Sequence, residues 1–245
     1  MEKHLEVIKK YVESKEVEDL ALCVKNLIEK NGQEAGEGAN ADVFRLNHET
    51  FGQICIKRSK KMRKFKIIDE EKEFDTQEEI WERGVSSPRP IILIEDKISK
   101  DRYIAMKFIE GCTIGEIMEG KQELPETYDH EKFWKKVESD IGLMHDKVGK
   151  YNKSIHHRDL HPYNLMIERA TGIPVLIDFG SSGEDFGGGD VYREDILMLN
   201  EEKGNYEFRK NYPLKNDLMQ MNSIKKEMFH KSLTIRSKSD IIPKK

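Results

Sequence analysis

The sequence lacks a long hydrophobic run and has little cysteine. Apolar runs such as IILI and IPVLI are far shorter than the roughly 20 residues that span a bilayer, and the amino-terminal MEKHLEVIKK has no apolar signal-peptide core. The three cysteines, Cys23, Cys55 and Cys112, are far apart and form no CxxC pair, which argues against a zinc site or a disulfide framework. We therefore expect a reduced, cytoplasmic protein with no membrane partner.

Neither sign of charge dominates the chain. Lys and Arg number 42 against 46 Asp and Glu, so the bulk charge does not predict a nucleic-acid partner. One basic run, KRSKKMRKFK at 57–66, is followed closely by the acidic DEEKE. We interpret this run as a solvated loop, in preference to a patch that binds nucleic acid or acidic substrates.

The spacing of apolar residues predicts helices and strands in separate parts of the chain. Helices are expected at about 3–30, 66–83 (ended by Gly84), 114–120, 130–148 and 215–230. Strands are expected at 41–46, 52–58, 90–96, 102–110, 164–167 and 174–179. Because strands dominate the first part and helices the second, we expect an α+β protein with two lobes that join near Phe108–Gly111.

A polar stretch, HHRDLHPYNLM at 156–166, lies between apolar segments. Asp159 and Asn164 are five residues apart in a loop, and Asp178 follows at the end of a strand. Carboxylate and amide oxygens of this kind hold Mg²⁺ together with phosphate. A carboxylate that does not bind the metal can accept a proton from an attacking hydroxyl. These are the groups that phosphoryl transfer requires.

Four motifs in order resemble those of protein kinases. HRDLHPYN resembles the catalytic loop H-R-D-x-x-x-x-N, and Asp178-Phe179-Gly180 resembles the D-F-G motif. Upstream, GEGANADV (36–43) resembles the glycine-rich loop, with Ala41 in the third glycine position, and Ile54-Cys55-Ile56-Lys57 resembles V-A-I-K. The resemblance covers roughly residues 34–230. It implies a bilobal α+β fold and an ATP-dependent kinase that phosphorylates protein Ser or Thr, including its own.

The resemblance also implies the catalytic roles. Lys57 would reach the α- and β-phosphates of ATP, with Glu73 as its helix partner and Glu70 or Glu78 as alternatives, since the helix phase is open. Asp159 would orient and deprotonate the acceptor hydroxyl. The Mg²⁺ ligands would be Asn164 and Asp178.

A second set of residues would bind the nucleotide. Backbone amides of the glycine-rich loop would cover the phosphates, Met106 would stand at the back of the adenine pocket, and the backbones of Lys107 and Ile109 would bond to adenine. The full set is Gly36, Glu37, Gly38, Ala39, Val43, Cys55, Lys57, Met106, Lys107 and Ile109.

The same resemblance gives the expected domain division. Residues 1–33 would be a helical extension that offers a surface to a partner. Residues 34–108 would be the β-rich lobe, and residues 109–245 a shortened, mainly helical lobe. No A-P-E motif follows Asp178. The acidic residue that anchors the catalytic loop would be Asp217, with Asp195 as the alternative.

Two other functions fit parts of the sequence. Small-molecule phosphotransferases, of the aminoglycoside or choline type, use a D-L-H-P-x-N loop, which Asp159-Leu160-His161-Pro162 resembles. Those enzymes and the small RIO-like kinases usually lack an arginine where Arg158 stands, so Arg158 favours protein substrates. The third possibility is a kinase-fold module that binds nucleotide with little turnover, against which the complete catalytic set argues.

Overall fold

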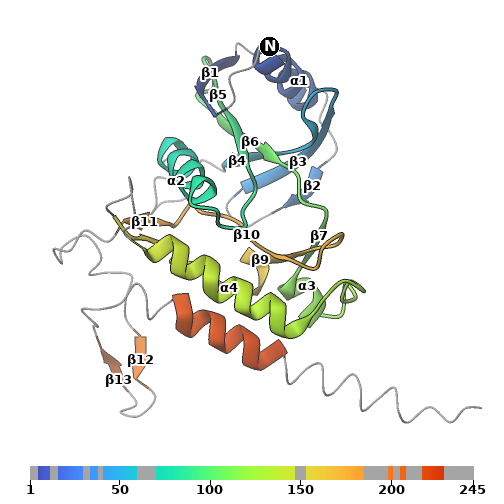
Figure 1. Ribbon diagram of the computed structural model, residues 1–245. Coiled ribbons are helices and arrows are strands. Elements are labelled where there is room, and N and C mark those ends of the chain that lie inside the picture. The colour runs from blue at the N-terminus through green and yellow to red at the C-terminus, as the bar shows by residue number, and fades with distance from the viewer. Residues whose placement is uncertain are drawn as a thin grey trace, which may run out of the picture.

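The computed structural model describes residues 5–11, 16–29, 34–37, 41–59, 70–146, 153–184, 198–200, 205–207 and 217–228. Figure 1 shows two lobes, one built on a sheet and one built mainly on helices. The bilobal α+β fold expected from the sequence is thereby confirmed. Among the described residues, no helix is both long and apolar enough to cross a membrane.

The first lobe is a six-stranded antiparallel sheet with the order β1-β5-β6-β4-β3-β2. Its strands are β1 (Leu5–Lys10), β2 (Glu34–Glu37), β3 (Ala41–His48), β4 (Gly52–Ser59), β5 (Pro90–Asp96) and β6 (Arg102–Lys107). Helix α1 (Glu16–Glu29) packs on one face. Its apolar side, including Leu20 and Val24, lies in one core with Ile54, Ile56 and Ile92. Glu18 and Asp19 on the same helix are exposed to solvent, as an amphipathic helix requires.

One sequence-based prediction for the amino terminus was wrong. Residues 5–10 were expected in a helix, but they form β1, which pairs with β5 so that Val7 lies opposite Ile94. The spacing of Leu5 and Ile8 fits a helix, but the open edge of β5 offers backbone partners that local periodicity does not reveal. Strand β1 pairs with the sheet of the first lobe, and α1 packs in the same lobe. A partner on α1 stays a prediction.

The second lobe is built around helix α4 (His130–His145), whose amino end is capped by Asp129. Its apolar face, including Trp134, Val137 and Met144, shares a core with Ile224 and Met228 of the helix over 217–228, drawn in red in Figure 1. The remaining elements are β7 (Gly111–Thr113), α3 (Ile114–Met118), β8 (Ile155–His156), η1 (Pro162–Asn164), β9 (Leu165–Glu168), β10 (Pro174–Leu176), β11 (Gly183–Glu184), β12 (Met198–Asn200) and β13 (Asn205–Glu207). Strands β10, β9 and β7 form one small sheet, while β8 pairs with β11 and β12 with β13. We propose that the lobes divide at 108/109, between β6 and β7.

Helix α2 (Glu70–Glu82) joins the two lobes. Its buried face carries Glu73, Phe74, Gln77 and Ile80, which recur at the spacing of one helix side. The helix ends where Gly84 adopts a φ of +81°, a conformation that glycine enters without the steric cost of a Cβ. Ile80 belongs to the core of the second lobe, so α2 reaches from the sheet to the helical lobe.

Candidate active site

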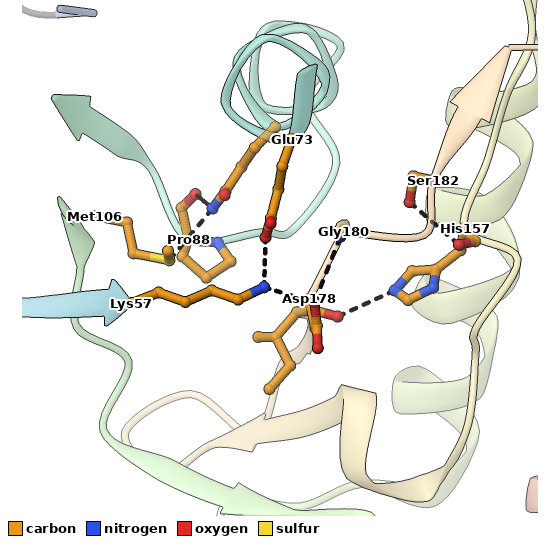
Figure 2. A network of polar contacts seen from close by, with 10 residues as sticks. Lys57, Glu73, Pro88, Met106, His157, Asp178, Gly180 and Ser182 are labelled. Carbon is orange, nitrogen blue, oxygen red and sulfur yellow. Dashed lines mark hydrogen bonds and ion pairs between the residues drawn. The ribbon is translucent and has the colours of Figure 1, made fainter. Parts of the chain in front are cut away.

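Lys57 of β4 lies between two carboxylates (Figure 2). Its Nζ is 2.6 Å from Oε1 of Glu73 on α2 and 2.7 Å from Oδ1 of Asp178, which follows β10. Glu73 lies on the buried face of α2 together with Phe74 and Gln77, and this face places it beside Lys57. The three residues come from both lobes, so this triad forms where the lobes meet.

The electrostatics of the triad follow from burial and pairing. Burial opposes the charge on Lys57, but Glu73 and Asp178 raise its pKa above the ordinary value, so the ammonium stays protonated. The pKa of Glu73 is raised, because burial outweighs the attraction of Lys57. Burial also acts to raise the pKa of Asp178, but the charge and hydrogen bond of Lys57, together with the amide of Gly180 and with His157, bring that pKa below its ordinary value. Because one ammonium faces two carboxylates, the ionised triad has a net negative charge that can attract a further cation.

Asn164, the last residue of η1, is bonded to the segment that carries Asp178. Its carbonyl oxygen accepts from the amide of Ile177 at 3.1 Å, so the residue before Asp178 is bonded to Asn164. The side-chain nitrogen of Asn164 donates to the carbonyl of Asp159 at 2.8 Å. This bond uses the nitrogen of the amide and leaves Oδ1, the atom that can bind Mg²⁺. The donor set of Asn164 and Asp178 therefore fits that ion.

Two backbone positions of the site are strained. Arg158 has a φ of +65° and Asp178 a φ of +61°, a left-handed conformation that side chains with a Cβ rarely adopt. The ring of His157 supports the second position, because its Nε2 donates to the carbonyl of Ile177 at 3.0 Å and the ring packs on Phe179. Strain of this kind persists where the surrounding structure fixes the backbone, and it is common at functional sites.

Gly180 leaves space for the side chain of Glu73. A Cβ at Gly180 would lie 3.1 Å from Oε2 of Glu73, tighter than an ordinary contact. This oxygen is buried and has no hydrogen-bond partner among the described residues. A side chain at position 180 would press against this oxygen of Glu73, the residue that contacts Lys57, so the glycine leaves room for that carboxylate.

Asp217 anchors the loop that is predicted to be catalytic. Its Oδ2 accepts from the amide of His157 at 3.0 Å and from Nε2 of His145 at 2.9 Å, and its Oδ1 accepts from the amide of Arg158 at 3.1 Å. The structure thus gives the anchoring position to Asp217. The alternative, Asp195, lies outside the described residues. Through these bonds the helix over 217–228 fixes the segment that carries Asp159.

Replacing Asp217 with asparagine tests the anchor. The amide cannot accept from all three donors, and one buried N–H would lose its partner, so we expect the free energy of unfolding to fall by about 3 kcal/mol. The measurement is urea denaturation followed by circular dichroism. Met219→Ala is the control: this residue is 46% exposed on the same helix, and we expect a change below about 0.5 kcal/mol. Equal stability of the wild type and Asp217→Asn would contradict the anchor.

The same anchor predicts a pH dependence. Burial acts to raise the pKa of Asp217, but the hydrogen bond from His145 and the charge of His157 bring that pKa below the ordinary value. A carboxylate with a lowered pKa stabilises the fold at a pH above its pKa in the unfolded chain, which is about 3.9. This contribution is lost as the pH falls through the pKa of the folded protein. The stability gap between wild type and Asp217→Asn should not narrow from about pH 7 to 5 and should narrow below about pH 4. A gap that already narrows between pH 7 and 5 would argue against this origin.

The residues expected to bind nucleotide lie along the β-lobe side of the site. Val43 is the cross-strand partner of Lys57, and Cys55 that of Met106. Burial raises the pKa of Cys55 to about 11, so its thiol stays protonated. Nε2 of Gln77 on α2 lies 3.5 Å from the sulfur of Met106, so α2 contacts the strand that carries Met106.

The rest of that set is only partly described. The amide of Lys107 donates to the carbonyl of Arg89 at 2.8 Å, and Ile109 follows in the connection to β7. Gly36 and Glu37 lie in β2, opposite Val43 and Asp42. Gly38 and Ala39 lie outside the described residues, as does the part of the basic run from residue 60 to 66.

Two residues that support the site were missed from the sequence. His145 bonds to Asp217, and Arg83 at the end of α2 bonds to the second lobe. His145 stands in the last turn of a predicted helix, where a cation is common, so its position alone carried no functional signal. Arg83 lies directly before the glycine that ends α2, and only the three-dimensional contacts reveal its partners.

Comparison with known proteins agrees with this geometry. Residues 30–196, more than half of the chain, match the protein kinase domain family, and the chain belongs to that family. A probable serine/threonine-protein kinase from Streptomyces coelicolor is 32% identical over 79 residues. The aligned segment is 32% of this chain and 10% of that protein, so the chain spans a small part of the relative that it matches. Protein kinase domains in general use ATP and Mg²⁺.

Proposed function

We propose that this chain is an ATP- and Mg²⁺-dependent kinase that phosphorylates Ser or Thr of protein substrates, including itself. The observation that carries the proposal is the buried contact of Lys57 with both Glu73 and Asp178, next to an asparagine whose amide oxygen is left for a metal. This arrangement brings a cation for phosphate and two oxygen ligands for a metal together in one site.

The roles follow from these positions. Lys57, held by Glu73, binds the α- and β-phosphates, and it exchanges its contact with Asp178 for them. Asn164 and Asp178 hold Mg²⁺, which neutralises charge on the phosphates when it is bound. Asp159 orients the acceptor hydroxyl and takes its proton. The catalytic loop needs the support of Asp217 to keep Asp159 in place.

The nucleotide lies under β2 and β3 in this proposal. Because the amide of Lys107 is bonded to Arg89, the carbonyl of Lys107 is the group left for the adenine amino group, and the backbone of Ile109 supplies the second contact. Met106 closes the back of the pocket, with Val43 and Cys55 on its wall. The backbone of residues 36–39 covers the phosphates.

Two observations support protein substrates. The relative from Streptomyces coelicolor is named as a probable serine/threonine-protein kinase. Arg158 stands where small-molecule phosphotransferases usually carry glycine. The second candidate, transfer to a small alcohol, is favoured by His161, whose Nδ1 accepts from the amide of Tyr163 at 3.2 Å and so fixes the imidazole two residues after Asp159.

Labelling of acceptors separates these functions. Purified protein is incubated with Mg²⁺ and γ-labelled ATP, together with casein and with a panel of aminoglycosides, sugars and amino alcohols. We expect phosphoserine or phosphothreonine on casein or on the protein itself, found by mass spectrometry and lost when EDTA removes Mg²⁺. Label on small alcohols alone would favour the second candidate. Nucleotide binding without any ADP release would favour a binding module.

A further inference from the structure

Arg83 connects the end of α2 to the second lobe through main-chain oxygens. It is the first residue after α2, and its side chain is 4% exposed. Its Nη2 also pairs with the carboxylate of Glu79, one turn earlier. The guanidinium donates to the carbonyls of Leu143 (3.3 Å), Met144 (2.9 Å), Asp146 (2.8 Å) and Lys153 (2.7 Å).

Leu143, Met144 and Asp146 lie at the carboxyl end of α4, and Lys153 lies shortly before β8. The last carbonyls of a helix have no partner within it, and a cation is favoured there by the helix dipole. Arg83 satisfies this end from a different helix, with the rigid five-donor fork that only arginine has. Lysine has a single ammonium and would satisfy fewer of these carbonyls.

Apolar and backbone contacts anchor the same end of α2. Ile80 and Val85 lie in one core with Trp134 and Val137 of α4. The amide of Leu176 in β10 donates to the carbonyl of Ser86 at 2.8 Å. The carboxyl end of α2 is therefore built into the second lobe, although its first turns contact the sheet of the first lobe.

We propose that Arg83 is a positioning residue for phosphotransfer, which holds α2 on α4 and thereby holds Glu73 against Lys57. Glu73 lies ten residues before Arg83, roughly 15 Å along a continuous helix, so a helix fixed at one end sets the position of the other. The inference rests on the proposed kinase function. It implies that the Lys57–Glu73 contact depends on the hydrogen bonds from Arg83 to the carboxyl end of α4.

Arg83→Met is the first test, because methionine keeps an apolar stem and loses every donor. We expect kcat for phosphotransfer to fall about tenfold (~1.4 kcal/mol), with a smaller change in KM for ATP. Lys153→Met is the matched control: its Nζ is 3.7 Å from Glu79 at the same interface, but it is 41% exposed, and we expect kcat to stay within about twofold. An Arg83→Met enzyme with the wild-type kcat overturns the proposal.

A double-mutant cycle with Glu73→Gln separates positioning from general stability. If Arg83 acts through Glu73, Arg83→Met lowers kcat less than about twofold in the Glu73→Gln background. A full tenfold loss in both backgrounds overturns the proposal. If Arg83→Met does not fold, Arg83→Lys takes its place in the cycle, with a smaller loss that must again disappear beside Glu73→Gln.

Hydrogen exchange of the nucleotide-free protein gives a readout that does not need activity. We expect Arg83→Met to speed amide exchange over residues 74–82, while exchange in β3 and β4 stays unchanged. Unchanged exchange in α2 overturns the positioning role even if the wild type proves inactive. A wild type that fails to phosphorylate any acceptor but shows this change in α2 contradicts the kinase proposal alone.

Discussion

Asp178→Asn is expected to lower kcat about a thousandfold. The substitution removes one of the two carboxylates that face Lys57, and it removes the only charged oxygen ligand proposed for Mg²⁺. Asparagine keeps the size of the side chain, so the strained backbone at this position is retained. The metal would lose a charged ligand and keep the neutral amide of Asn164. We therefore also expect weaker binding of ATP in the presence of Mg²⁺.

Isothermal titration and steady-state kinetics measure these two effects. Asp75→Asn is the matched control, because Asp75 lies on α2 in an exposed ion pair with Lys9 at 2.6 Å, with 54% of its side chain exposed. We expect this control to leave both kcat and ATP affinity within about twofold. An Asp178→Asn protein whose affinity for Mg²⁺-ATP and kcat both match the wild type would rule out Asp178 as a metal ligand.

Asp159→Asn is the second large effect. Loss of a general base typically costs about 10² to 10⁴ in rate, and we expect kcat to fall within that range. The bond from Asn164 is made to the backbone carbonyl of Asp159, so the loop survives the substitution. Affinity for Mg²⁺-ATP should therefore stay within about threefold of the wild type.

The effect on nucleotide affinity distinguishes the two aspartates. Asp178→Asn should reduce both nucleotide affinity and turnover, whereas Asp159→Asn should reduce turnover alone. Single-turnover experiments with labelled ATP separate the chemical step from product release. Phosphotransfer at the wild-type rate by Asp159→Asn would refute its role as the base.

Much of the fold and the site could be predicted because their signals are local. Asp159, Asn164 and Asp178 lie within one segment of 20 residues, at the spacings of the motifs that the sequence resembles. Glu73 was predictable from helix periodicity, since Gln77 and Ile80 mark the buried face of α2. Each of these inferences depends on a few neighbouring residues.

The features that the sequence did not predict depend on distant partners. Residues 5–10 have helical spacing, but the free edge of β5 made them a strand. Asp217 and Asp195 both followed the catalytic loop, and only the bonds to His157 and Arg158 show that Asp217 is the anchor. Arg83 caps a helix whose end lies 60 residues further along the chain. No local pattern records such contacts.

The most direct test is a crystal structure with Mn²⁺ and a non-hydrolysable ATP analogue. The account predicts an anomalous peak at bonding distance from Oδ1 of Asn164 and from the carboxylate of Asp178. It also predicts that Lys57 stays bonded to Glu73 and contacts the phosphates in place of Asp178. A nucleotide bound with no metal at these two side chains, or with Lys57 away from every phosphate, would contradict it.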